Sequence, residues 1–206
     1  VYICGTDGST AKWWKNGVEQ PALTSGTEAK SIFVYNGDAY ICGTNGSSAI
    51  WWKNGVIQPS LSNGESAESI FLDNNDVYVC GYKGSTAKWW KNGIEQSQLN
   101  FGLNTAHAYS IFVSDGNVYI WGYHTVSNDE AKWWKNGVEQ PALTDGTNDA
   151  IANSIFVYSG DVYICGYENN GSKNVAKWWK NGVEQPALTD GTNTAAANSI
   201  FIAPNI

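Results

Sequence analysis

The sequence predicts an all-β protein in which one four-stranded antiparallel unit is repeated five times. Three observations lead to this fold class: a phrase that recurs along the chain, two hairpin signals in each copy, and two partial copies at the ends that fit together in phase. The phrase is WWKNG, which opens at Trp13, Trp51, Trp89, Trp133 and Trp178. A period of roughly 20 to 50 residues is typical of repeat architectures, so it constrains the fold more strongly than any single strand does.

Each copy contains two hairpin signals. Residues 31–43 read SIFVYNGDAYICG, two short runs of apolar and aromatic residues around Asn36-Gly37, which is typical of a β-hairpin. Residues 11–23 read AKWWKNGVEQPAL and turn at Asn16-Gly17, a dipeptide suited to a type I′ turn because both of its residues adopt positive φ there. Each repeat is therefore expected to form four antiparallel strands.

A covariation between copies supports the register of the second hairpin. With a two-residue turn at Asn16-Gly17, Glu19 lies opposite Trp14 and diagonal to Lys12 on one face of the sheet. The equivalent Lys and Glu are kept in three further copies, whereas the second copy carries Ile50 and Ile57 instead. An ion pair is thus exchanged for an apolar pair, as the proposed register requires.

The two ends of the chain complete each other. Residues 199–206 read SIFIAPNI, the start of a unit, and residues 1–5 read VYICG, the continuation of one. Joining them restores the step of 12 residues from Ser to Gly that the copy from Ser31 to Gly43 shows. A closed ring needs this phase match, whereas an open solenoid needs polar caps instead.

We therefore predict one five-bladed β-propeller domain over 1–206, closed by a C-terminal strand that completes the N-terminal blade. The predicted blades are residues 199–206 with 1–23, and then 31–61, 69–99, 110–143 and 154–188.

On these repeats the whole chain resembles known β-propellers. Its strand order is similar to that of NHL and WD40 propellers, and its blade number to that of five-bladed lectins of the tachylectin-2 type, although their signature motifs are absent. The WKNG and VYICG phrases resemble repeats of uncharacterised bacterial secreted proteins. The resemblance implies a fold, and it leads us to expect a secreted or cell-surface bacterial protein.

Composition excludes several classes of protein. With 206 residues and 42% hydrophobic side chains, the chain can bury a core. A net charge of -7, with lysine as its sole cationic residue type, disfavours nucleic acid as a partner. No apolar run approaches the roughly 20 residues that span a bilayer, so no membrane-spanning segment is expected. The absence of methionine leads us to expect a processed product or a fragment.

Cysteine and histidine give no strong signal for a metal or a disulfide. Cys4, Cys42, Cys80 and Cys165 occupy one repeat position, which Trp121 fills in the remaining copy. Neighbouring sheets pack about 10 Å apart, beyond disulfide reach, so we expect four buried free thiols. His107 and His124 fall near Tyr109, Asp129 and Glu130. These residues have two interpretations, a metal site or solvated positions in loops, and the second is favoured for the two histidines. No metal or cofactor is therefore predicted.

Catalysis is not indicated either. Resemblance to five-bladed glycosidases would imply a pair of carboxylates near the central channel, but the innermost strands read SIFVY, SIFLD, SIFVS, SIFVY and SIFIA. Asp145, Asp149 and Asp190 match a calcium loop only loosely, and Asn45 and Asn170 open NGS sequons. We expect a protein that is not an enzyme.

Both segments of variable length are expected on one face, since in propellers the loops that leave the second and fourth strands share a rim. After the second strand these loops are 6–10, 44–48, 82–86, 123–130 and 167–175, and after the fourth they are 24–30, 62–68, 100–109, 144–153 and 189–198. Loops on a rigid scaffold often carry function. The candidate ligand-binding residues are Tyr82, Tyr123, Tyr167, Asn45, Asn170, His107, Tyr109, His124, Asp145 and Asp190.

The favoured hypothesis is a monomeric, lectin-like binding module whose loop face recognises carbohydrate. Neutral hydroxyls, amides and tyrosine rings suit sugars, but Asn, Gly and Ser also simply make good turns. The alternative is a structural or protein-interaction scaffold of a surface assembly, with a surface protein as partner, and a glycoside hydrolase is the third hypothesis.

The paired tryptophans have two interpretations, sugar-stacking platforms or inter-blade core, and the core is favoured because neighbours on a strand face opposite sheets. Replacing Trp89 with alanine is therefore expected to lower the free energy of unfolding by about 3 to 5 kcal/mol. Chemical denaturation measures this value, and an unchanged midpoint would contradict the assignment of these side chains to the core.

Overall fold

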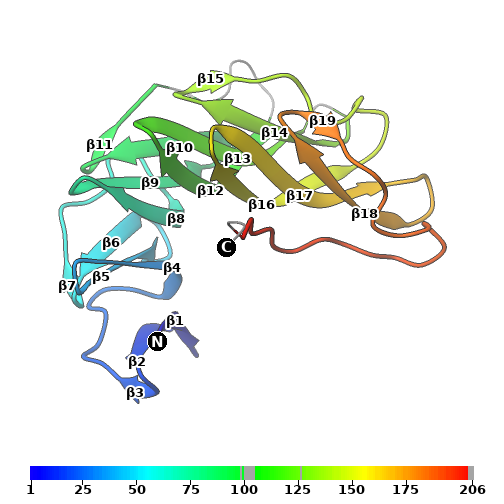
Figure 1. Ribbon diagram of the computed structural model, residues 1–206. Helices are drawn as coiled ribbons and strands as arrows, with labels where there is room; N and C mark the ends of the chain where they lie inside the picture. The colour runs from blue at the N-terminus through cyan, green and yellow to red at the C-terminus, as the bar shows by residue number, and fades with distance from the viewer. Residues whose placement is uncertain (98, 100–104, 126, 204–206) are drawn as a thin grey trace. The chain divides into compact units, whose positions relative to one another are not determined.

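The computed structural model describes residues 1–97, 99, 105–125 and 127–203. The chain divides into two compact units, Val1–Gln98 and Leu99–Ile206, which we call the N-terminal and C-terminal units. All regular structure in the described residues is β-strand (Figure 1). Within these residues there is no helix long and apolar enough to cross a membrane.

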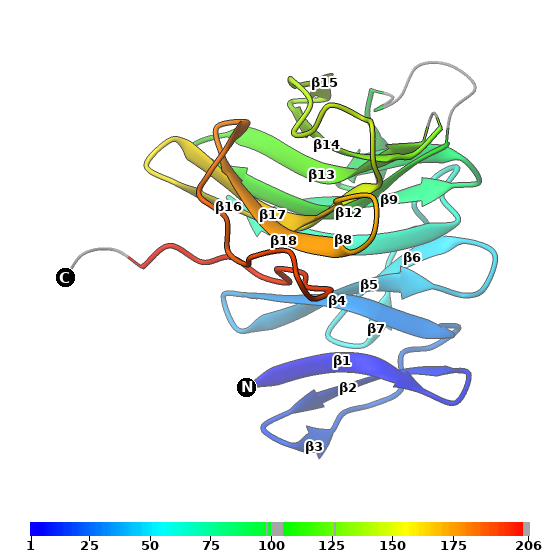
Figure 2. The ribbon, with the colours of Figure 1, turned by 90° about the vertical axis from the view of Figure 1, so that its right-hand side faces the viewer.

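The N-terminal unit contains three antiparallel sheets. Sheet A comprises β1 (Tyr2–Asp7), β2 (Thr10–Lys15) and β3 (Val18–Glu19). Sheet B comprises β4 (Glu28–Tyr35), β5 (Asp38–Thr44), β6 (Ala49–Lys53) and β7 (Val56–Ile57), and sheet C comprises β8 (Ser66–Asp73), β9 (Asp76–Lys83), β10 (Thr86–Lys91) and β11 (Ile94–Glu95). Strand β4 packs against both β1 and β8, so sheet B lies between the other two (Figure 2).

The C-terminal unit contains two four-stranded sheets of the same design. Sheet D comprises β12 (Thr105–Ser114), β13 (Asn117–Thr125), β14 (Asp129–Lys135) and β15 (Val138–Glu139). Sheet E comprises β16 (Ala150–Tyr158), β17 (Asp161–Asn169), β18 (Asn174–Lys180) and β19 (Val183–Glu184). The prediction of an all-β fold with five successive antiparallel, blade-like sheets is confirmed.

The predicted register of the second hairpin is confirmed. Glu19 pairs with Trp14, and the diagonal ion pair joins Lys12 Nζ to Glu19 Oε1 at 3.2 Å. The turn residues Asn16 and Gly17 have φ values of 52° and 80°, as the type I′ turn requires. The ion pair recurs between Lys88 and Glu95, Lys132 and Glu139, and Lys177 and Glu184.

In sheets B and C the two tryptophans of the phrase connect their sheet to different segments. The indole N–H of Trp51 donates to the carbonyl of Pro59 in its own repeat at 3.1 Å. The indole of Trp52, which is fully buried, donates instead to the carbonyl of Thr24 in the linker from the preceding sheet, also at 3.1 Å. Sheet C repeats this second bond between Trp90 and Ser62 at 2.9 Å. The expectation that the paired indoles are core is confirmed for these residues.

Lysine and asparagine of the phrase are equally structural. The Lys53 ammonium lies 5.2 Å from the ring centroid of Tyr40 and 2.8 Å from an Asp38 carboxylate oxygen. Asn54 accepts a hydrogen bond from the backbone N–H of Ala39 through Oδ1 and donates to Asp38 through Nδ2, both at 2.8 Å. The side chains of the WWKNG phrase in sheet B therefore take part in contacts that hold the sheet together.

A β-bulge explains the glycine that follows each Tyr-x-Cys or Tyr-x-Trp. In sheet C the register shifts between Ala67 and Ser69, opposite Gly81, and a Cβ on Gly81 would overlap the carbonyl oxygen of Ser66. Sheets B, D and E carry the same bulge opposite Gly43, Gly122 and Gly166. Beyond the bulge the first strand of each of these sheets continues pairing, so these strands start three to five residues earlier than the Ser-Ile-Phe phrase suggested.

The prediction of four free thiols is confirmed, whereas the prediction that all four are buried is wrong for Cys4. All four thiols are free, and Cys42, Cys80 and Cys165 are buried. Burial raises the pKa of Cys165 to about 11, which makes its thiol a poor nucleophile. Cys4 is only half-buried, because sheet A has no fourth strand beside β1 among the described residues.

The segment before the C-terminus packs on sheet E as an inner strand packs on its neighbour. Ile200 N–H donates to Ser154 Oγ at 3.4 Å and the Phe156 and Phe201 ring centroids are 4.9 Å apart. Strand β8 makes the matching contacts on sheet B, from Ile70 to Ser31 at 3.4 Å and from Phe71 to Phe33 at 4.6 Å.

No strand is assigned to residues 199–203, and 204–206 lie outside the described residues. Pairing of 199–206 with 1–5, and with it one closed domain over 1–206, stays a prediction.

Replacing Gly81 with alanine is expected to cost about 3 kcal/mol of unfolding free energy, the upper end of usual overpacking costs, because the backbone at the bulge cannot move aside cheaply. Thermal or urea denaturation measures the loss, with Ser97→Ala on the exposed chain as the control. A Gly81→Ala protein as stable as the control would show that the bulge is not a steric constraint.

The equivalent substitution Gly5→Ala tests ring closure. In sheet A an added Cβ meets only the Trp14 ring, at an ordinary 3.7 Å, so an incomplete sheet tolerates alanine. If residues 199–206 add the fourth strand with the same bulge, Gly5→Ala is expected to destabilise the protein about as much as Gly81→Ala does. A harmless Gly5→Ala would argue against closure.

Candidate functional site

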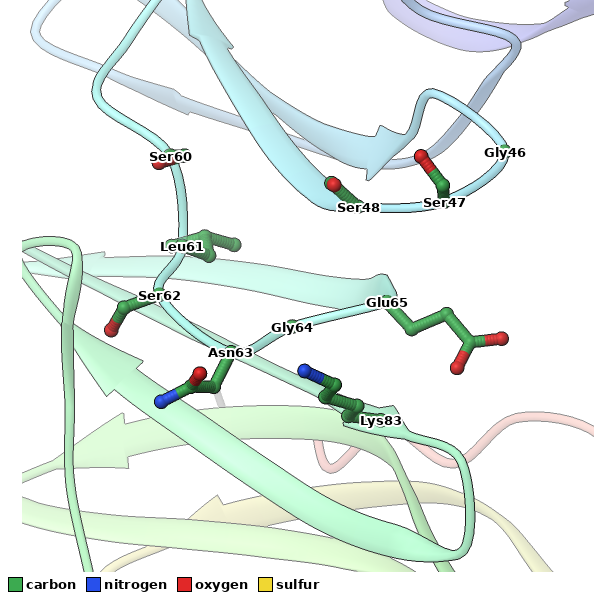
Figure 3. A pocket seen from close by; sticks show the side chains of 10 residues that line it. All are labelled: Gly46, Ser47, Ser48, Ser60, Leu61, Ser62, Asn63, Gly64, Glu65 and Lys83. Atoms are coloured by element: carbon green, nitrogen blue, oxygen red, sulfur yellow. The ribbon is translucent and has the colours of Figure 1, made fainter.

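A pocket in the N-terminal unit lies between sheets B and C, and we call it the serine pocket. It has a volume of about 490 Å³. Its walls are the loop Gly46–Ser48 after β5, the linker Ser60–Glu65 after β7, and Lys83 at the end of β9. Figure 3 shows the linker running across from the loop, with the Lys83 amine pointing toward Asn63 and with Gly46 and Glu65 at the end remote from Ser60.

The loop wall is fixed by an asparagine. Oδ1 of Asn45 accepts hydrogen bonds from the backbone N–H groups of Ser47 at 3.1 Å and Ser48 at 2.8 Å. The N–H of Gly46 donates to Thr44 Oγ1 at 3.0 Å. Asn45, a predicted ligand-binding residue, therefore shapes this wall rather than lining the pocket.

The linker wall is clamped between two sheets. Leu61 is buried, and the carbonyl of Gly64 accepts a hydrogen bond from Ala49 N–H at 3.1 Å. A Cβ on Gly64 would lie 2.6 Å from the Ala49 side chain and 2.8 Å from the Trp90 ring, closer than packed atoms approach, so only glycine fits here. The polar side chains of this wall therefore project from a rigid backbone.

A second pocket, of about 210 Å³, adjoins the first, and we call it the tyrosine pocket. Gly46 and Glu65 line both pockets. The other lining residues of the tyrosine pocket are Thr27, Glu28, Lys30, Thr44, Ser66 and Tyr82. Tyr82, predicted as a ligand platform, thus lies on a described pocket.

Charged groups in the tyrosine pocket are paired. Lys30 Nζ lies 3.2 Å from Glu28 and 3.4 Å from Glu68, and the Ser66 hydroxyl donates to Glu68 at 2.6 Å. Partial burial disfavours the charged amine, but Glu68 and Glu28 outweigh that effect and raise the pKa of Lys30. Lys30 is therefore protonated and held in place at neutral pH.

The C-terminal unit has a pocket at the equivalent repeat position, which we call the amide pocket. Its volume is about 320 Å³. It brings together three predicted residues, Asn170, Asp145 and Asp190, with neighbours from both linkers that flank the loop after β17. The remaining lining residues are Thr147, Asn148, Glu168, Asn169, Val175, Lys177, Thr189 and Gly191.

The loop of the amide pocket is built like that of the serine pocket. Oδ1 of Asn170 accepts from the backbone N–H groups of Ser172 at 3.1 Å and Lys173 at 2.9 Å, as Asn45 does for its own loop. Asp145 and Asp190 close turns in the two linkers, each accepting from the hydroxyl of the threonine two residues later, at 2.7 Å and 2.8 Å.

The placement of the three predicted tyrosines in loops is wrong. Tyr82, Tyr123 and Tyr167 lie within β9, β13 and β17 and pair with inner-strand residues, His107 in the case of Tyr123. The bulge lets the inner strand continue past the Ser-Ile-Phe phrase, so its partner strand also continues past the glycine. Burial, with Asp129 and Asp149 nearby, raises the pKa of Tyr167.

His107, Tyr109 and His124 are also strand residues, not solvated loop residues. His107 and Tyr109 belong to β12 and His124 to β13. The Tyr123 hydroxyl lies 3.3 Å from His107 Nδ1, and the Tyr109 ring packs 5.8 Å from that of Trp121. The rings of His107, Tyr109 and Tyr123 therefore pack against one another and do not form an open platform.

Within the described residues no group of three or more His, Cys, Asp or Glu side chains is arranged to hold a metal. The predicted loops 100–109 and 123–130 are described only in part, because 100–104 and 126 lie outside the described residues, as does 98 in the predicted blade 69–99.

Several pocket residues were not singled out from the sequence. Ser62, Asn63 and Glu65 lie within the predicted loop face, as do Glu28 and Lys30. No copy repeats their side-chain types, so the recurrence that identified the tyrosines gave no signal for them. Only their position in the linkers after the fourth strands could have pointed to these residues.

The chain matches no model of a known protein family and, in a search of curated proteins, no relative.

The aspartate turns of the amide pocket have a measurable consequence. The Thr147 hydroxyl and then its N–H lower the pKa of Asp145, so the turn is stabilised above the ordinary aspartate pKa and loses this support as pH falls through the lowered value. Thr147→Ala is expected to move the Asp145 pKa back up. Carboxyl NMR titration measures it, with Asp190, held by the unaltered Thr192, as internal control; an unchanged Asp145 pKa would contradict the assignment.

Proposed function

We propose that this protein is a non-enzymatic, lectin-like module that binds carbohydrate at polar pockets beside the loops after the second strands. The observation that carries the proposal is recurrence. The serine pocket in one unit and the amide pocket in the other are both built from the loop after the second strand and the linker after the fourth. Two sites at one repeat position suit multivalent binding of a repetitive ligand.

The chemistry of the walls supports this ligand class. The serine pocket presents the hydroxyls of Ser48, Ser60 and Ser62. Ser47 and Asn63 also line it, but the Ser47 hydroxyl donates to Asn45 Oδ1 and the Asn63 amide to a Glu95 carboxylate oxygen, each at 3.2 Å, so these two side chains offer a ligand mainly acceptor oxygens. Serine hydroxyls both donate and accept hydrogen bonds, which matches sugar hydroxyls. The clamped linker keeps them in place before binding, so little entropy is lost on binding.

The proposal includes a location outside the cell and a monomeric state. The support for an extracellular role is the likeness of the WKNG and VYICG phrases to repeats of bacterial secreted proteins. Size-exclusion chromatography with light scattering tests the monomeric state.

A protein-interaction scaffold is the second candidate, and one observation favours it. Asn45, Asp145 and Asp190 already use side-chain oxygens to close their own turns. Residues that satisfy one another in this way can shape a surface for a protein partner without contacting a small ligand.

A glycan array separates these two functions. Binding to one or more glycans is expected, and Ser62→Ala is expected to weaken it about fivefold, the effect of one lost hydrogen bond of about 1 kcal/mol. Ser97→Ala, an exposed serine that lines none of the three pockets, is the matched control. An array without binding, together with self-association in solution, would favour the scaffold.

Incubation with the bound oligosaccharides tests the non-enzymatic part. Unchanged sugars are expected by mass spectrometry. Hydrolysis that survives purification and is lost in Glu28→Gln or Glu65→Gln would instead identify a glycosidase.

A further inference from the structure

The geometry points to a two-subsite groove in the N-terminal unit, which we propose binds a linear, uncharged oligosaccharide of at least two sugar residues. The serine pocket forms one subsite and the tyrosine pocket the other. This inference rests on the proposed carbohydrate function and specifies its ligand class.

Continuity of the two pockets is the first argument. Gly46 and Glu65 line both, and Figure 3 shows them together at one end of the serine pocket, away from Ser60. Gly46 has no side chain to divide the two hollows. A chain that fills the serine pocket therefore leaves it toward Tyr82.

Rigidity of the junction is the second argument. Thr44 Oγ1 donates to the Glu65 carbonyl at 2.9 Å, and the Gly84 N–H donates to a Glu65 carboxylate oxygen, also at 2.9 Å. Thr27 Oγ1 donates to the carbonyl of Thr44 at 3.1 Å. The loop of sheet B is thereby tied to both flanking linkers, so the two subsites keep a fixed spacing.

The two subsites differ in chemistry. The serine pocket offers hydroxyls and an amide, whereas the tyrosine pocket offers a half-buried aromatic ring. A sugar ring presents hydroxyls at its edge and C–H groups on its face, so hydrogen bonding suits the first subsite and packing against Tyr82 suits the second.

Charge disfavours acidic sugars in the tyrosine subsite, whereas the serine subsite carries one lysine, Lys83. Glu28, Glu65 and Glu68 surround the tyrosine pocket, and Lys30, the cation there, is already paired with Glu28 and Glu68. A carboxylate or sulfate on the sugar in this subsite would meet the remaining negative charge, because the one lysine that lines it is already paired and Lys83 lines the other subsite. An acidic oligomer places such a group on every residue, so at least one of them falls in the tyrosine subsite.

Isothermal titration calorimetry with length series tests the inference. The probes are oligomers of one to six residues of glucose, mannose and N-acetylglucosamine, all β-1,4-linked, with oligogalacturonates as the anionic series. For the neutral series that binds, affinity is expected to rise roughly tenfold from one residue to two, equivalent to about 1.4 kcal/mol. Oligogalacturonates are expected to bind at least tenfold more weakly than neutral oligomers of equal length.

Two variants assign the increment to the second subsite. Tyr82→Ala is expected to abolish the gain in affinity from the second sugar, while a monosaccharide in the serine subsite binds as before. Glu28→Ala, at a half-exposed side chain of the tyrosine subsite, is expected to reduce the same gain and serves as a second test should Tyr82→Ala fail to fold. Ser62→Ala is expected to weaken all lengths by one common factor.

The outcomes separate this inference from the function beneath it. Affinity independent of length, a length gain untouched by both variants, or oligogalacturonate binding as tight as neutral binding overturns the two-subsite groove and leaves carbohydrate binding intact. Failure of every probe here and of every glycan on the array rejects the proposed function itself, and the groove with it.

Discussion

Sheets B and C are held to their neighbours chiefly by a contact between the second tryptophan of the pair and the linker that precedes its sheet. Trp52 and Trp90 are fully buried, and each donates its indole N–H to a linker carbonyl 28 residues earlier. Their rings lie so close to Gly26 and Gly64 that no side chain fits there. One residue thus fills the space between two sheets and fixes the chain that connects them.

Linker length changes this contact. In the C-terminal unit the linker before sheet E is three residues longer than those before sheets B and C, and the Trp179 indole N–H has no hydrogen-bond partner among the described residues. Thr144 Oγ1 in the same linker is also buried without one. The longer linker instead uses Asp145 and Thr147 to close its own turn, so it gains polar surface at the amide pocket as it gives up the indole bond.

The edge of each sheet formed by its last strand is poorly suited to pairing with a further strand. Each outer strand has two residues, and in each copy the glutamine that follows donates its side-chain amide to the carbonyl of the first of them, as Gln20 does to Val18 at 3.0 Å. Short, capped edges resist pairing with other chains. The copies differ instead in their loops and linkers, which line the described pockets.

The repeat, the two turns of each copy and the register of the second hairpin could all be predicted from the sequence, because they depend on local rules. Asn-Gly dictates the turn, and the exchange of Lys12 and Glu19 for Ile50 and Ile57 reports a cross-strand pair. The sequence also brought Asn170, Asp145 and Asp190 to attention as loop residues. Tertiary structure decided the rest. Tyr82 and Tyr123 lie in strands because a bulge, visible only once Gly81 and Gly122 face an inner strand, lengthens the hairpin. Pockets arise where the loop after a second strand meets one linker and the end of a neighbouring strand, as in the serine pocket, or two linkers, as in the amide and tyrosine pockets. A meeting of segments far apart in the chain leaves no local signal at residues such as Ser62 and Glu65.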